Sequence, residues 1–183
     1  LADVNALPTN LFVGNFTAGT RPVADQRLDG RVVLSGANTY TGTTTVRSGI
    51  LEIATAGAPT TTSIALDAPG SLVASGAYTG VAAWVASNKL TTASAGSLAL
   101  SGDTAETITM ALYPTLLLGA VSPSALNTLS ASFTPGAQGY RFGGGGSTLT
   151  VNTVLTGANA LNVGAAGSLG TVVLAGFNDY AGA

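Results

Sequence analysis

Short apolar segments closed by glycine recur along this chain at intervals that constrain its fold. Three of them open alike, as GSLVASG at 70–76, GSLALSG at 96–102 and GSLGTVVLAG at 167–176. The closing glycines are Gly36, Gly76, Gly102, Gly157 and Gly176. The shorter intervals, 76–102 and 157–176, are near the length of one β-solenoid turn, and the longer ones, 36–76 and 102–157, fit two turns and two to three turns. Because one such turn cannot bury its inward side chains alone, the spacing predicts stacked turns.

Candidate strands are short, rich in β-branched residues and bounded by Gly, Asn or Pro. The sequence predicts them at 31–34, 43–46, 51–53, 63–66, 71–74, 97–100, 107–112, 148–151, 160–163 and 171–174. Helical periodicity is almost missing, and the best short helix is expected at 124–133, with Ser124 as its N-cap. We therefore predict an all-β fold, a β-solenoid segment of a repetitive protein.

The composition is typical of secreted, fibrous or repetitive β proteins. Charged residues make up 8% of the chain, with 25 Gly, 26 Thr and 15 Ser, whereas charged residues are about 25% of a typical soluble domain. A net charge of −2 with scattered basic residues offers no electrostatic grip on nucleic acid. The chain has no Cys, so it has no thiolate nucleophile. It has no His, so it lacks the commonest general base and the commonest metal ligand. We predict no metal and no cofactor.

The most apolar run, at 108–121, is too short to span a bilayer and contains Pro114. No membrane span is predicted in this segment. The sequence begins with Leu and stops inside a motif, so we expect a segment of a longer polypeptide.

One motif occurs twice, early in the chain and again at its C-terminal end. VVLSGANTYTG at 32–42 returns as VVLAGFNDYAG at 172–182, with Val, Val, Leu, Gly, Asn, Tyr and Gly in the same places. This duplication predicts a solenoid repeat unit at 31–183, with a second repeat beginning at 172. The region 1–30 contains two prolines and three charged residues between Asp25 and Asp29, so we expect an irregular entry segment there that contacts the neighbouring unit. The structural positions of the motif are Leu34, Gly36, Asn38, Tyr40 and Gly42 in the first copy and Leu174, Gly176, Asn178, Tyr180 and Gly182 in the second. Tyr40 and Tyr180, with their asparagines, are expected to occupy equivalent places in successive units.

The first copy and the residues that follow it, LSGANTYTGTTTVRSGILEI at 34–53, resemble the passenger-associated transport repeat of bacterial autotransporter-type proteins. The family pattern falls on Leu34, Gly36, Asn38, Tyr40, Gly42, Thr44, Val46, Gly49 and Leu51. The resemblance implies a right-handed parallel β-helix that is exported and displayed at a cell surface or shed. It implies no catalytic residues.

Three patterns invite a chemical interpretation, and each has a simpler one. Asp103 and Glu106 form the closest acidic pair, yet a solvated turn explains them better than a glycan-cleaving site, because few basic residues accompany them. The run GGGGST at 143–148 lacks the Lys of a phosphate loop and precedes a strand, so a tight corner is expected. The alternation of Thr41, Thr43 and Thr45 would bind ice only if the row were kept on many turns, and the sequence does not keep it.

Two further positions concern modification and packing. Asn15 lies in a single NFT sequon, a possible glycosylation site, and the many Thr and Ser are possible glycan acceptors. Trp84 is expected to fill the core or to contact a neighbouring unit.

Taken together, the patterns predict a non-enzymatic structural repeat unit of an extracellular bacterial fibre or long cell-surface protein. Its partners would be copies of itself or adjacent repeats of the same chain, joined head to tail, because contacts between unlike surfaces give open filaments. The alternative is an adhesin or phage-fibre segment that binds surface glycans.

Overall fold

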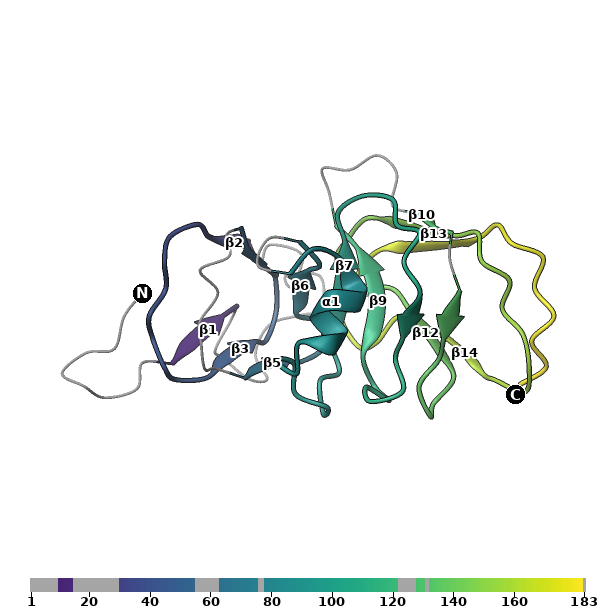
Figure 1. Cartoon of the computed structure of the whole chain (residues 1–183), viewed down its shortest axis with the longest axis horizontal. Helices are drawn as coiled ribbons and strands as arrows, with labels where there is room; N and C mark the ends of the chain where they lie inside the picture. The colour runs from purple at the N-terminus through teal and green to yellow at the C-terminus, as the bar shows by residue number, and fades with distance from the viewer. Residues whose placement is uncertain are drawn as a thin grey trace.

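The computed structural model describes residues 10–14, 30–54, 63–75, 78–121, 128–130 and 132–182. It is an elongated stack of short strands with its two ends far apart (Figure 1). Every pairing between its strands is parallel. The strands are β1 Leu11–Val13, β2 Arg31–Leu34, β3 Thr44–Val46, β4 Ile50–Ile53, β5 Ile64–Leu66, β6 Ser71–Val73, β7 Ser97–Leu100, β8 Ile108–Thr109, β9 Leu117–Ala120, β10 Thr128–Leu129, β11 Phe133–Thr134, β12 Tyr140–Phe142, β13 Thr148–Val151, β14 Leu161–Val163 and β15 Thr171–Leu174.

One seven-stranded sheet, here called the long sheet, runs the length of the molecule in the order β14-β12-β9-β7-β6-β4-β2. Its neighbouring strands are one turn of chain apart. The register pairs Arg31 with Ile50, Ile50 with Ser71, Ser71 with Ser97, Ser97 with Leu117, Leu118 with Phe142 and Tyr140 with Leu161. Each of these steps has the length expected of one turn, which confirms the predicted parallel β-solenoid.

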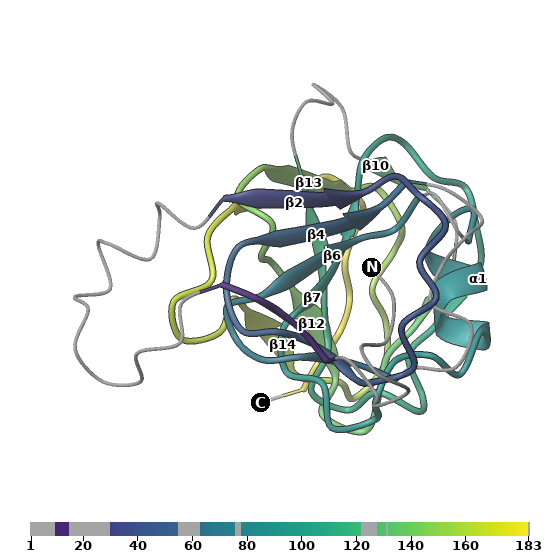
Figure 2. The same ribbon diagram turned by 90° about the vertical axis from the view of Figure 1, so that its left-hand side faces the viewer.

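Smaller sheets form the other sides of the solenoid. The N-terminal sheet has the order β1-β3-β5, the C-terminal sheet has the order β10-β13-β15, and β8 pairs with β11. Viewed along the long axis, the strands of the long sheet fan out from β2 at the top to β14 near the bottom (Figure 2). Twist of this kind is the normal behaviour of parallel strands. As a result, β13 of the C-terminal sheet lies on the same side of the axis as β2.

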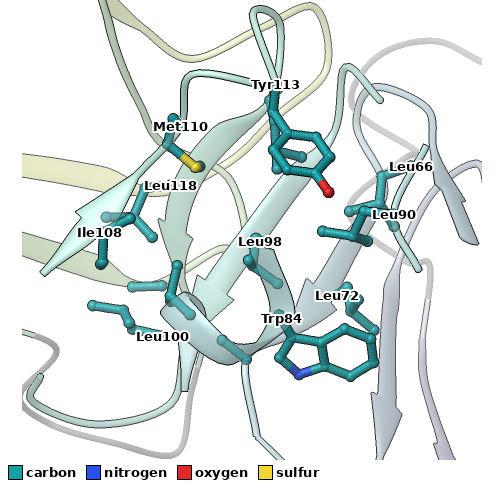
Figure 3. Packing of buried hydrophobic residues seen from close by; sticks show 14 of the residues in the cluster. Leu66, Leu72, Trp84, Leu90, Leu98, Leu100, Ile108, Met110, Tyr113 and Leu118 are labelled. Carbon is teal, nitrogen blue, oxygen red and sulfur yellow. The ribbon is translucent and has the colours of Figure 1, made fainter. Parts of the chain in front are cut away.

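A ladder of inward side chains fills the solenoid along the long sheet. It is made by Val32, Leu51, Leu72, Leu98, Leu118, Phe142 and Val163, which pair in that order. The five interior members are fully buried, whereas Val32 and Val163 at the two ends are 38% and 60% exposed. Figure 3 shows Leu72, Leu98 and Leu118 among the surrounding core residues. Each fully buried member contributes about 1.5–3 kcal/mol.

A helix appears where none was predicted. The helix α1, Val81–Ala86, lies between β6 and β7 and explains why the step from Ser71 to Ser97 is the longest in the long sheet. Its Trp84 is fully buried against the core, which confirms the core-filling role (Figure 3). The helix expected at 124–133 is wrong in its described part, because Thr128–Leu129 and Phe133–Thr134 are strands. Serine and threonine in that region favour extended backbone over helix.

The repeated GSL segments divide into two kinds. In the first two, Ser71 pairs with Ser97, both side chains are buried, and the two hydroxyl oxygens lie 2.7 Å apart. The third does not join this row, because Ser168 lies in the corner before β15 and its hydroxyl donates to the Ala165 carbonyl at 2.9 Å. Of the three similar GSL segments, only the first two therefore lie side by side on neighbouring turns.

Candidate functional site

The two ends of the solenoid are the most distinctive surfaces of this molecule. Nine large apolar side chains are exposed among the described residues, and seven of them lie at the ends. They are Phe12, Val32 and Val33 at the N-terminal end and Val163, Leu169, Val173 and Phe177 at the C-terminal end. The edge strands at these ends are β1 and β2 at one and β14 and β15 at the other. Exposed parallel edges of this kind are templates for further strand pairing.

The first copy of the motif forms the corner between β2 and β3. The Asn38 side-chain amide donates to the Gly36 carbonyl at 2.8 Å, which fixes a local turn. The chain then buries Tyr40 completely, with its hydroxyl 2.6 Å from the Thr44 hydroxyl at the start of β3. Burial raises the pKa of Tyr40, and the hydrogen bond to Thr44 opposes that shift.

The second copy repeats this turn at the other end. The Asn178 amide donates to the Gly176 carbonyl at 2.8 Å, as in the first copy. Its carbonyl oxygen also accepts the Leu155 N–H of the preceding turn at 3.0 Å. Tyr180 is partly buried and packs edge-on against Tyr140, with ring centroids 6.3 Å apart. Asn178 therefore stabilises its own corner and connects this corner to the preceding turn by a hydrogen bond.

The two copies share a conformation but not a sheet. Val32–Leu34 lies in the long sheet, whereas Val172–Leu174 lies in the C-terminal sheet and pairs with β13. The asparagine turn is the same in both copies, while the motif has moved from one side of the cross-section to another. The twist seen in Figure 2 is the physical reason, because it carries the C-terminal sheet round to the side where β2 begins. The equivalence of Tyr40 and Tyr180 in successive units stays a prediction.

The glycines of the two copies differ in what lies against them. A Cβ on Gly176 would lie 2.6 Å from the Thr153 carbonyl oxygen, and one on Gly182 would be blocked by the backbone at Asn159 and Ala160. A Cβ on Gly36 would meet none of the described residues within 4 Å. In the second copy, glycine is required by the close approach of the preceding turn. In the first copy, no turn formed by the described residues lies against Gly36 in the same way.

The comparison with family models agrees with this local structure. Residues 29–53 match the family model of the passenger-associated-transport-repeat. The match covers the β2 edge, the Asn38 corner, β3 and β4, and it confirms the autotransporter-type repeat suspected from the motif. A passenger-associated repeat indicates a repeat of a passenger region, in a protein that is secreted or held at a surface. Neither the curated proteins nor the solved structures contain a significant match to this chain.

The acidic pair is brought together beside the N-terminus of α1. Asp103 accepts the Thr128 N–H at 2.8 Å, and Glu106 accepts the Ala82 N–H at 3.2 Å. Both carboxylates line a partly open cavity of about 210 Å³ together with Gly80. Each carboxylate accepts a hydrogen bond from a backbone N–H in another part of the chain, and this gives both side chains a structural role.

The threonine and glycine patterns also find structural explanations. Thr45 is flanked in the register by Phe12 and Ala65, so no threonine row crosses these three strands. The four glycines of the run 143–146 all have positive φ and form the corner between β12 and β13. A Cβ on Gly144 would lie 2.5 Å from the Ser97 hydroxyl. The glycine run therefore makes the tight corner that the sequence indicated.

Three other features concern membranes, metals and glycans. Within the described ranges, no helix combines the length and the apolar character that crossing a bilayer demands. The same ranges contain no cluster of three or more acidic, His or Cys residues that could hold a metal ion. The possible glycosylation site Asn15 and most of the predicted N-terminal segment 1–30 lie outside the described residues.

The buried tyrosines predict a loss of stability at high pH. Burial raises the pKa of Tyr40 and of Tyr113 above 10.0 in the folded state. Their contribution to the free energy of unfolding is fully present below pH 10.0. It is lost as the pH rises through the folded-state pKa, because the tyrosines of the unfolded chain ionise first. Urea unfolding followed by circular dichroism at several pH values should show this decline. Tyr40→Phe should reduce it, and an unchanged pH profile in that variant would contradict the assignment to Tyr40.

Proposed function

We propose that this segment is a non-enzymatic structural unit of an extracellular fibre or long surface protein, and that units join end to end. The observation that carries the proposal is the pair of exposed parallel edges at opposite ends of one continuous core ladder. The ladder ends in exposed Val32 on one side and exposed Val163 on the other, so each end has apolar surface left to bury.

Mechanical continuity is the role that this architecture serves. Backbone hydrogen bonds between turns run along the long axis, and each added turn buries the inward residues of the one before it. Extra units would therefore extend the same ladder without a new kind of contact. Because the two ends are different surfaces, such joining is head to tail and yields an open filament.

A binding role receives less support from the described surface. Phe12 and Phe177 are the aromatic side chains among the large exposed apolar residues, and they lie at opposite ends. A glycan-binding groove usually needs several polar and aromatic groups converging on one place. The adhesin or phage-fibre alternative would be favoured if the monomeric chain bound members of a sugar panel.

Electron microscopy and sedimentation of the full chain at increasing concentration test the structural role. The six steps of the long sheet span about 29 Å, and one joining step adds about 5 Å. We expect filaments or short oligomers with an axial repeat of about 34 Å. A chain that stays monomeric at millimolar concentration would count against end-to-end joining.

A further inference from the structure

We infer that the joint has a defined register, in which β15 of one copy pairs in parallel with β2 of a second copy and Val173 lies beside Val33. This joint rests on the proposed end-to-end function and names the surfaces that carry it. Val172 would then lie beside Val32, and Leu174 beside Leu34. The occupant of the β2 edge is thus the C-terminal turn of another copy of this chain.

The repeated motif matches the two edges to each other. Both edge strands read Val-Val-Leu, and both lead into the same asparagine turn, with the amide-to-carbonyl distance at 2.8 Å in each. Stacked in register, the two strands would place identical side chains next to one another. Inward Val172 would extend the pairing of Leu149 with Val172 to Val32 and Leu51 of the second copy.

The glycine contacts point to the same register. Gly176 is held against the carbonyl groups of Asn152 and Thr153 in the turn below it. For its counterpart Gly36, none of the described residues lies within 4 Å of the Cβ position. In the proposed register, the residues of the neighbouring copy around Ala175 and Gly176 occupy this space. The need for glycine in the first copy is then explained by the joint.

The order of the strands around the axis also fits this joint. At one end β1 precedes β2, as β14 precedes β15 at the other. Seating β15 against β2 therefore also brings β14 towards β1, whose Leu-x-Val sequences match at 11–13 and 161–163. The C-terminal sheet of one copy would continue as the long sheet of the next. The long sheet of the first copy would in turn continue as the N-terminal sheet of the second copy.

Single-cysteine variants test this register, because the chain has no cysteine of its own. Val33 and Val173 face outward and are 48% and 41% exposed, so both can be replaced without opening the core. Val33→Cys and Val173→Cys are mixed, one of them isotopically labelled, and oxidised. Neighbouring strands are about 4.8 Å apart, within the Cα separation that a disulfide spans. We expect mixed disulfide dimers, identified by mass spectrometry.

A register control uses Val33→Cys with Thr171→Cys. Thr171 is on the same outward face of β15 but two residues away, a shift of about 6.6 Å, so its mixed dimer should form at about a tenth of the yield or less. If oligomers form but the Thr171 pair cross-links as well as the Val173 pair, the register is overturned and the proposed function stands. If no variant oligomerises, the proposed function fails together with the joint.

Discussion

Trp84→Ala should destabilise the solenoid by about 3–5 kcal/mol, the range for removing a large buried aromatic side chain. Trp84 is fully buried, and its ring packs edge-on against Tyr78 with centroids 4.6 Å apart. Its indole N–H donates to the Ser75 carbonyl at 3.3 Å. Alanine would leave a cavity beside Leu72 and Leu98, and that carbonyl would lose its donor (Figure 3).

Urea unfolding followed by far-ultraviolet circular dichroism measures this effect, since the variant has no tryptophan to report by fluorescence. Trp84→Phe should lose less, because the ring volume is largely kept while the N–H is lost. Leu112→Ala serves as a surface control, since Leu112 is 60% exposed, and should change the stability by less than about 0.5 kcal/mol. Equal losses for Trp84→Ala and Leu112→Ala would show that Trp84 does not support the core.

The fold class could be predicted because solenoid turns leave a local signature. Short strands with β-branched residues, closed by glycine at intervals of one or two turns, are enough to indicate stacked parallel strands. The paired Ser71 and Ser97 follow directly from the first two GSL segments. Strand bounds at Arg31–Leu34, Ser97–Leu100, Thr148–Val151 and Thr171–Leu174 agree with the sequence prediction.

Features that depend on neighbouring turns could not be predicted in the same way. The strand expected at 107–112 is only Ile108–Thr109, because a turn follows in which the Tyr113 N–H donates to the Met110 carbonyl. The helix α1 has only six residues, too few for a periodic pattern to stand out. Nor does a sequence report twist, so the move of the motif from the long sheet to the C-terminal sheet became visible only in three dimensions.

The candidate site was partly visible in the sequence. The duplicated motif lies near both ends of the described solenoid, and in each copy the asparagine amide donates to the carbonyl of the preceding motif glycine. What the motif alone could not show is which side of each glycine faces another turn. That information comes from the backbone contacts of Gly176 and Gly182, set against the open space beside Gly36.

Gly96→Ala is the second change for which we expect a large effect. A Cβ on Gly96 would overlap the Gly70 carbonyl oxygen and would lie 2.8 Å from the Asp67 carbonyl oxygen, both in the turn below. These atoms belong to backbone that is itself hydrogen-bonded between turns, since the Ser97 N–H donates to the Gly70 carbonyl at 3.0 Å. The turns would have to separate, at a cost of about 1–3 kcal/mol or more.

Gly102→Ala is the matched control for this prediction. Gly102 closes the same GSLALSG segment, yet a Cβ there would meet none of the described residues within 4 Å. Its replacement should be neutral or slightly stabilising, because alanine lowers the conformational entropy of the unfolded chain. Thermal unfolding of both variants measures the difference. Gly96→Ala as stable as Gly102→Ala would mean that the turns do not approach closely at this corner. A large loss confined to Gly96→Ala would show that the glycine opening this GSL segment is kept by the stacking distance between turns.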